Sequence, residues 1–251
     1  MNETKVDKLY ISTPSTDKII IEEKDLNHKK RPSWIKSKID KKAIFVKIIH
    51  NNEAFWYRRY FKDYFFPLEK SSEDYKNYYN YIAKEYESFT PQNKKIGEFI
   101  SKKLKEINIS FENKILDLGC GTGIIAENIV REGFENVSLL DISEKEIEVA
   151  LYKKELKNKK SFILDLTKQE IPEEYDVIIE SMSLDYFKGD QLKFILNNIN
   201  SSLEREGVFI MVDRHLNPQL KSIFKEIQSG KFSLETNEGN FDYFFFIGKK
   251  N

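Results

Sequence analysis

From Asn113 onward, short apolar runs alternate with segments whose apolar residues recur every three or four positions. The runs predict strands at Lys114–Leu118, Val137–Leu140, Ser161–Leu164, Asp176–Ile179 and Val208–Val212. The intervening segments predict helices at Gly123–Glu132, Glu144–Leu156, Gly189–Leu203 and Pro218–Gln228. Two last runs, Lys231–Glu235 and Phe241–Ile247, predict a hairpin that places one antiparallel strand in the sheet. The pattern indicates an α/β fold whose seven-stranded, mostly parallel sheet is doubly wound.

Two helices are expected before this sheet, over residues 71–107. The first covers Ser71–Phe89, where apolar and aromatic side chains form one stripe: Tyr75, Tyr78, Tyr79, Ile82, Tyr86 and Phe89. Pro91 opens the second helix, with its own apolar face: Ile96, Phe99, Ile100 and Leu104. We assign residues 71–251 to one domain that carries these helices at its N-terminal end.

Residues 1–70 have a different character and are expected to form a small appendage that contains β-structure. Lys18–Glu22 is a short β-branched run, and Ala43–Ile49 and Ala54–Phe61 predict a hairpin that turns at residues 50–53. The segment Lys24–Lys47 is markedly basic, and aromatic residues follow it as far as Phe66. The basic segment forms either a solvated face or a patch that binds nucleic acid.

Composition narrows the classes of protein. The chain of 251 residues has 41 basic and 41 acidic residues, so its formal net charge of zero gives no general attraction to nucleic acid or anionic membrane. No apolar stretch approaches the roughly 18 residues of a membrane span. The single Cys120 excludes an internal disulfide. We expect a cytoplasmic protein, and the sequence leaves its oligomeric state open.

The candidate chemistry lies where the strands end. Ile115–Gly123 reads I-L-D-L-G-C-G-T-G, a strand that breaks into a glycine turn before a helix. Acidic residues end the next two strands, Asp141 and Asp165. A dinucleotide site would have the spacing G-x-G-x-x-G, and Asp117 beside the turn would repel a pyrophosphate. The Asp117 carboxylate would instead suit a ligand that carries an ammonium group. S-adenosylmethionine (SAM) is the ligand that combines an adenine, a free ribose diol and a cationic amino-acid tail.

The motifs resemble those of the class I, Rossmann-like SAM-dependent methyltransferases. Ile115–Gly123 matches the first motif of that family throughout, and the resemblance covers about residues 75 to 248. Weaker similarity follows in the expected order at four later segments: Leu140–Ser143, Leu164–Leu166, Tyr175–Leu184 and Glu206–Ile210.

The resemblance implies a role for each candidate. The turn residues Asp117, Gly119, Cys120, Gly121 and Gly123 would hold the methionine end of SAM, with Ser181 nearby. Asp141, followed by Ile142, would take the ribose hydroxyls, and Asp165 with Leu166 would contact adenine. An upstream aromatic lid would use Tyr79 and Tyr86, with Tyr78 and Tyr81 as alternatives. Alternatives without a ligand remain open. The aspartates could cap helices or lie in solvated loops, Ser143 could itself cap the next helix, and the tyrosines could only pack their helix on the sheet.

The methyl acceptor is harder to read. Methyl transfer needs mainly in-line positioning, with a general base only if the nucleophile must lose a proton. Asp185, Tyr186 and His215 are the candidate bases by position, although each could be an ordinary surface residue. Cys120 lies inside the donor motif, so it is not expected to act as a nucleophile, and no metal site is expected.

Three functions remain open. The first is methylation of a nitrogen or oxygen nucleophile on a small molecule. The second is an RNA or protein methyltransferase that docks its substrate on the basic N-terminal segment. The third is a SAM-binding module that regulates a partner and has no catalysis of its own.

Overall fold

The computed structural model describes residues 8–12, 18–22, 45–50, 53–61, 64–67, 71–236 and 239–251. The chain divides into two compact units, Met1–Tyr78 and Tyr79–Asn251. The first unit contains a five-stranded antiparallel sheet in the order β2-β1-β3-β4-β5. Its strands are β1 Lys8–Ser12, β2 Lys18–Glu22, β3 Phe45–His50, β4 Glu53–Phe61 and β5 Tyr64–Pro67. Strands β3 and β4 form the expected hairpin, whereas most of the basic segment lies outside the described residues.

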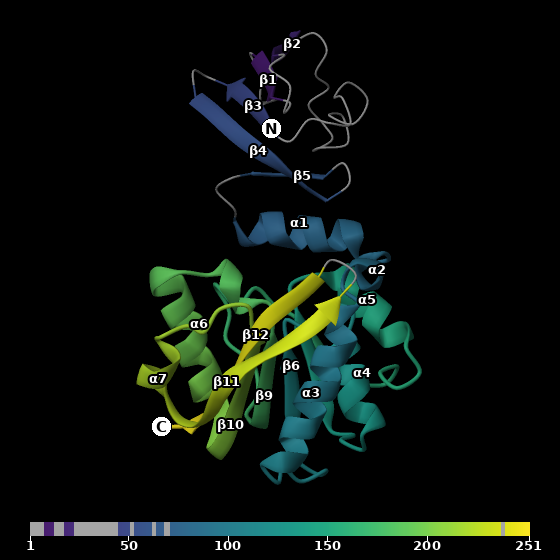
Figure 1. The fold of residues 1–251 in the computed structure, drawn as a ribbon, viewed down its shortest axis with the longest axis vertical. Coiled ribbons are helices and arrows are strands. Elements are labelled where there is room, and N and C mark those ends of the chain that lie inside the picture. The colour runs from purple at the N-terminus through teal and green to yellow at the C-terminus, as the bar shows by residue number, and fades with distance from the viewer. Residues whose placement is uncertain are drawn as a thin grey trace. The chain divides into compact units, whose positions relative to one another are not determined.

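The second unit is built on a seven-stranded sheet in the order β11-β12-β10-β9-β6-β7-β8 (Figure 1). Its strands are β6 Ile115–Leu118, β7 Val137–Asp141, β8 Ser161–Ile163, β9 Tyr175–Ser181, β10 Leu203–Asp213, β11 Phe224–Thr236 and β12 Gly239–Lys250. Strands β6 to β10 pair in parallel, and β12 runs antiparallel between β10 and β11. The predicted fold class is therefore confirmed, including its single antiparallel strand.

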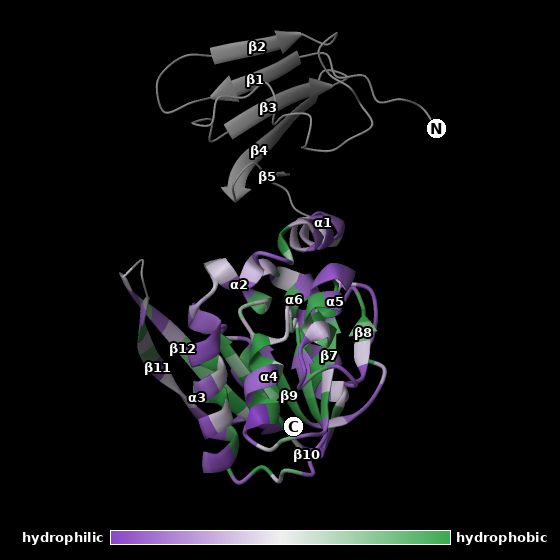
Figure 2. Cartoon of the chain, turned by 90° about the vertical axis from the view of Figure 1, so that its right-hand side faces the viewer, coloured by the Kyte–Doolittle hydropathy of each residue, from purple (hydrophilic) through white to green (hydrophobic). Residues whose placement is uncertain are grey.

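Helices cover both faces of this sheet. On one face lie α3 Gln92–Glu106, α4 Ile124–Arg131 and α5 Glu144–Tyr152. On the other lie α6 Gly189–Ser201 and α7 Leu220–Ile223. Alternate residues of each strand point to opposite faces, so Ile210 joins the first core and Met211 the second. Figure 2 shows the result: β9, the middle strand of the sheet, is hydrophobic, and α3 is largely hydrophilic on the side seen in this view.

The helix expected at Pro218–Gln228 is wrong for its second half. Helix α7 spans only Leu220–Ile223, and β11 begins at Phe224. The long strand β12 offers a pairing partner as far as Lys250, which faces Phe224. The Phe224 ring also stacks on Phe209 at 4.9 Å between centroids. Pairing and packing across the sheet thus override a local pattern that also fits a helix.

The N-terminal helical stripe is divided in two. Helix α1 spans Ser72–Ile82 and α2 spans Tyr86–Phe89, with a turn at residues 83–85 between them. Helix α5 is also shorter than expected and ends at Tyr152. Among the described residues, no helix is both long and apolar enough to span a bilayer.

Gly123, which precedes α4 after the turn that follows β6, provides a test of the packing between the helices. Gly123 has φ +74°, and an added Cβ would lie 2.7 Å from Cδ1 of Leu156 and 2.9 Å from Cβ of Ala150. Gly189 has φ +56° with nothing within 4 Å. We expect Gly189→Ala to lower the free energy of unfolding by about 1 kcal/mol through backbone strain alone. Gly123→Ala adds overpacking and should cost about 3 kcal/mol in total. Urea unfolding checks this, and equal losses would contradict it.

Candidate functional site

The glycine turn after β6 is held by hydrogen bonds to the end of β7. The backbone N–H groups of Gly119 and Cys120 both donate to the carbonyl oxygen of Leu140, at 2.8 and 3.1 Å. The N–H of Gly121 donates to Oδ2 of Asp141 at 2.8 Å. Gly119 has φ +68°, and a Cβ there would lie 2.5 Å from Oγ of Ser183 in the loop after β9. The turn therefore joins the carboxyl ends of three neighbouring strands, where open α/β sheets bind ligands.

Asp117 lies beneath this turn. Its side chain is buried, and its Oδ2 accepts a hydrogen bond from the N–H of Ala126 in the first turn of α4 at 3.1 Å. Burial raises the pKa of the Asp117 carboxyl to about 7, although this N–H opposes the rise. Burial also raises the pKa of Cys120, which keeps its thiol protonated and agrees with a turn residue better than with a nucleophile.

Asp141 organises the end of β7. Its Oδ1 accepts from the N–H of Ser143 at 2.8 Å, while Oδ2 accepts from Gly121. Ser143 in turn caps α5 by accepting from the N–H of Glu146. Each carboxylate oxygen keeps a further lone pair for a ligand hydroxyl, so capping and ribose binding are compatible here. The neighbouring Ile142 is half-buried.

Asn80 supports this arrangement and was missed by sequence reasoning. Its Oδ1 accepts from the Ser143 hydroxyl at 2.8 Å and from the N–H of Lys145 at 3.1 Å. The residue stands among the tyrosines of the N-terminal stripe, and no motif marks it. Only the tertiary contact shows that it helps to hold the start of α5.

Asp165 is largely occupied by its own turn. Its Oδ1 accepts from the N–H and hydroxyl of Thr167 at 3.0 and 2.6 Å, and its Oδ2 pairs with Lys168 at 2.7 Å. Leu166 is partly buried against the core on the α6 side. These contacts fit the alternative in which Asp165 only caps its own turn. An adenine contact for Asp165 and Leu166 stays a prediction.

Three tyrosines gather beside the glycine turn. The hydroxyls of Tyr79 and Tyr186 lie 2.6 Å apart, and the Tyr79 ring meets that of Tyr86 edge-on at 6.1 Å. Cε1 of Tyr86 lies 3.6 Å from the position of a Cβ on Gly121. The two tyrosines proposed as a lid are thus together, next to the turn and tied to the loop after β9. Of the alternatives, Tyr81 is 48% exposed and Tyr78 is buried.

Glu180 shapes that loop. Its buried Oε1 accepts three hydrogen bonds, from the N–H and hydroxyl of Ser183 at 2.6 and 2.9 Å and from the N–H of Leu184 at 2.9 Å. The loop then makes one 3-10 turn at Leu184–Tyr186. Ser181, which ends β9, is half-buried at the same edge. Glu180 therefore fixes where the Ser183 side chain stands against the donor turn.

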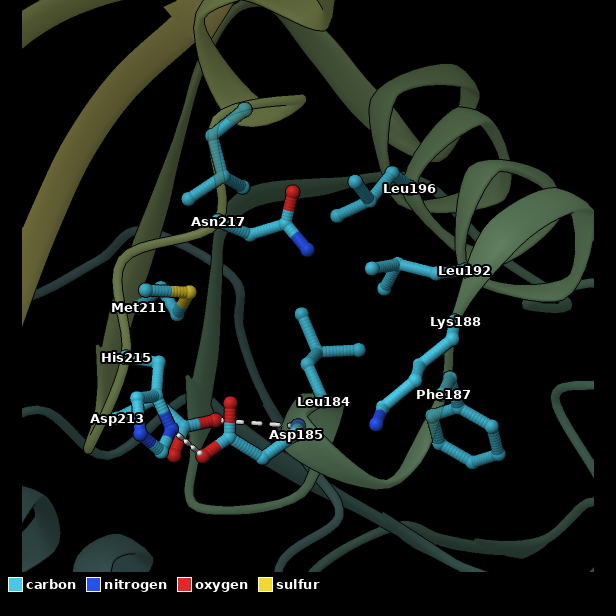
Figure 3. A pocket seen from close by; sticks show the side chains of 11 residues that line it. Leu184, Asp185, Phe187, Lys188, Leu192, Leu196, Met211, Asp213, His215 and Asn217 are labelled. Carbon is cyan, nitrogen blue, oxygen red and sulfur yellow. Dashed lines mark hydrogen bonds and ion pairs between the residues drawn. The ribbon is translucent and has the colours of Figure 1, made fainter.

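Beyond this loop, two of the candidate bases meet. Nδ1 of His215 lies 2.8 Å from Oδ2 of Asp185, and Oδ2 of Asp213 accepts from the N–H of Asp185 at 3.3 Å (Figure 3). These groups line one side of a cavity of about 400 Å³. Its lining is Leu184, Asp185, Phe187, Lys188, Leu192, Leu196, Met211, Asp213, His215, Asn217 and Leu220. Tyr186, the third candidate base, instead bonds to Tyr79 on the donor side.

Comparison with known proteins agrees with this geometry. Residues 109–245 match a family model described as a methyltransferase domain, and the match spans more than half of the chain. The chain belongs to this methyltransferase family. The methyl donor of the family is SAM, and the domain is a SAM-dependent methyltransferase domain.

Relatives of known name match the same region. The malonyl-[acyl-carrier protein] O-methyltransferase of Bacillus anthracis is 26% identical over 136 residues, which cover 53% of this chain and 49% of the relative. The ubiquinone biosynthesis O-methyltransferase of Yersinia pestis is 39% identical over 72 residues, covering 27% of this chain and 29% of the relative. The match thus spans about half of the first relative's length and less of the second.

Solved structures share the fold. The N-methyltransferase NodS of Bradyrhizobium japonicum, in complex with S-adenosylhomocysteine (SAH), aligns with a TM-score of 0.51 at 14% identity. That alignment covers 61% of this chain and 86% of NodS. Magnesium protoporphyrin IX methyltransferase of Synechocystis, with bound SAM, also aligns with a TM-score of 0.51 at 14% identity. That alignment covers 73% of this chain and 86% of the other.

The residues at the carboxyl edge fit SAM by their chemistry. The edge offers buried carboxylates for the hydroxyls and cationic groups of the donor. An added Cβ on Gly119 would overlap Ser183, so only glycine fits at this point of the turn. Among the described residues, no lysine or arginine forms an ion pair with Asp117 or Asp141.

Replacement of Asp141 tests the donor site. We expect Asp141→Ala to weaken SAH binding by about 1.5–3 kcal/mol, because charge-assisted hydrogen bonds to the ribose are lost. Asp176→Ala is the control, since Asp176 also accepts a backbone N–H, from Lys114 at 2.7 Å, but at the amino end of the sheet. Isothermal titration with SAH compares the two. Equal affinities of the two variants for SAH would contradict the role of Asp141.

The buried acids Glu180 and Asp213 predict a pH dependence of stability. Burial is the main cause that raises the pKa of both, and repulsion between neighbouring acids adds to it. Above the ordinary carboxyl pKa of about 4, the unfolded chain ionises while the folded one keeps its protons, so stability falls as pH rises. Between pH 5 and pH 8.5 the wild-type protein should lose free energy of unfolding, and we expect Asp213→Asn to reduce that loss by about 1 kcal/mol or more. Asp190→Asn, an exposed control, should leave the thermal-melt profile unchanged.

Proposed function

We propose that this domain transfers the methyl group of SAM to a nitrogen or oxygen nucleophile on a small molecule. The observation that carries the proposal is the hydrogen-bonded pair of Asp185 and His215 at the side of a largely apolar cavity. The cavity, of about 400 Å³, falls in the usual range for small-molecule sites.

The cavity is suited to an apolar acceptor with one reactive polar group. Leu192 and Leu196 from α6 line it opposite the acids, with Asn217 directed between them (Figure 3). Lys188 and His215 are its basic side chains, and Asp185 and Asp213 its acidic ones. The mixture of leucines and a few converging polar groups favours a neutral or amine-bearing molecule over a strongly anionic one.

The pair of Asp185 and His215 has the geometry of a general base. Asp185 holds Nδ1 of the imidazole at 2.8 Å, which leaves Nε2 free to accept a proton from the acceptor. The carboxylate also stabilises the imidazolium that forms. SAM supplies a methyl group already activated on sulfur, so the protein has only to align the acceptor and remove its proton.

One short loop connects the donor and acceptor sides. Ser183 lies against Gly119 of the donor turn, and Leu184 and Asp185 line the cavity. Glu180 fixes the first two of these residues through its three hydrogen bonds. A rigid loop of this kind supports in-line transfer, because it sets the distance between the methyl group and the nucleophile.

The names of the sequence relatives support an oxygen nucleophile as one form of the proposal, since both are O-methyltransferases. Docking of RNA or a protein on the basic N-terminal segment receives no support of this kind, because residues 23–44 lie outside the described part of the chain. Both remain outcomes of the experiment below.

The test uses the full chain and SAM labelled in its methyl group. The protein is incubated with lysate separated into small molecules, RNA and protein, and label is followed in each fraction. We expect label among the small molecules. Label in RNA or protein instead would overturn the choice of acceptor, and SAH binding without any transfer would indicate a non-catalytic module.

Variants test the proposed base. We expect His215→Ala and Asp185→Asn to slow label transfer by about 100-fold, the lower end of general-base contributions, while SAH affinity stays unchanged. Asp190→Asn removes an exposed carboxylate at the start of α6 and should transfer label at the normal rate. Unaltered transfer by His215→Ala would show that the pair does not act as the base.

A further inference from the structure

Glu146 is a buried acid that the donor motifs do not explain. It lies in the first turn of α5 and is only 2% exposed. Among the described residues its Oε1 has no hydrogen-bond partner. Buried carboxyl oxygens are normally satisfied, because an unpaired one loses its interactions with water and gains none in return.

The local cap explains why Oε1 of this side chain is left without a partner. In a capping box, the acid at this helix position reaches back to the N–H of the capping residue. Here the N–H of Ser143 already donates to Oδ1 of Asp141. Glu146 therefore keeps only half of the motif, the bond from its own N–H to the Ser143 hydroxyl at 3.1 Å. Oε1 of its carboxyl group is therefore not used by the cap.

The carboxyl group points into the donor site. Oε2 of Glu146 lies 3.4 Å from the position of a Cβ on Gly121, and Cε1 of Tyr86 lies 3.6 Å from the same point. The space over Gly121 is thus bounded by Glu146, Tyr86 and the turn itself. Asp141, whose Oδ2 binds the Gly121 N–H, lies at the same place. Repulsion from Asp141 adds to burial in raising the pKa of Glu146.

We propose that Glu146 is a second carboxyl group for the ribose diol of SAM, alongside Asp141. The inference rests on SAM as the donor and does not depend on the identity of the acceptor. The diol presents two hydroxyl donors, and each oxygen of Asp141 already accepts one backbone N–H group, which leaves it one further lone pair. The carboxyl group of Glu146, whose Oε2 lies near Gly121 and whose Oε1 accepts no hydrogen bond from the described residues, supplies a further acceptor for one hydroxyl.

Other parts of the donor fit this position less well. A cationic amino-acid end is served by Asp117, which lies on the other side of the turn against α4. Adenine offers one amino group and otherwise acceptors or an apolar face, whereas the diol brings two donors to the start of α5. The diol is therefore the part of SAM that matches two adjacent carboxyl groups.

The experiment combines protein variants with ligand variants. SAH, 2′-deoxy-SAH and 3′-deoxy-SAH are titrated into the wild-type protein, Glu146→Gln and Glu146→Met. We expect Glu146→Met to bind SAH about tenfold more weakly and Glu146→Gln, which keeps one acceptor oxygen, to bind less weakly. Removal of one of the two hydroxyls should weaken binding to the wild type but have little further effect on Glu146→Met, because coupled partners are not additive.

Controls separate this contact from a general effect of charge. Glu144→Gln removes an exposed carboxylate from the same helical turn and should bind all three ligands as the wild type does. Thermal melts should show that Glu146→Met is at least as stable as the wild type without ligand, which excludes misfolding as the cause of weak binding.

Two results would overturn the assignment. If both deoxy ligands lose the same factor in the wild type and in Glu146→Met, Glu146 does not contact the diol. If Glu146→Met binds SAH normally, the residue is only a buried acid. Failure of the wild-type protein to bind SAH is a different result, and it would refute the donor assignment itself.

Discussion

The carboxyl edge of the sheet concentrates acidic side chains in a place where burial removes them from water. Five acids are buried there, namely Asp117, Asp141, Glu146, Glu180 and Asp213. Among the described residues, none of them forms an ion pair with lysine or arginine. An isolated buried charge is costly, so these groups need hydrogen-bond donors or remain protonated. The rest of the site can be understood as the way in which this requirement is met.

Backbone N–H groups supply many of the hydrogen-bond donors that the buried acids need, and they thereby set the shape of the site. Asp141 takes two, from Gly121 and Ser143, and so joins the glycine turn to the start of α5. Glu180 takes two more and folds the loop after β9. These two acids are thus partly satisfied by the N–H groups of the loops that bend around them. The loops that carry the donor and acceptor contacts are therefore positioned by the acids, which is why their exposed residues stand in fixed places.

The alternating strands and helices, and the acids at the strand ends, can be predicted from the sequence. The contacts between these elements cannot. Strand ends at Asp117 and Asp141 follow from periodicity, because apolar runs stop where the sheet meets its ligand edge. Glu146 looks like an ordinary first-turn acid of α5, and only its burial distinguishes it. The residues after Ile223 fit a helix until β12 is there to pair with them. Long-range pairing and burial decide both cases, and neither has a local signal.

The acceptor side illustrates the same limit and shows how far local reasoning reaches. Asp185 and His215 follow β9 and β10, thirty residues apart in sequence, and their positions alone predict them as candidate bases. Adjacent parallel strands end side by side, so residues that follow them must come close. Asp213 also accepts the N–H of Asp185 at 3.3 Å, and so contributes to holding the backbone from which that side chain reaches His215. A buried acid again positions an exposed pair, and the same principle that holds the donor turn extends to the cavity beside it.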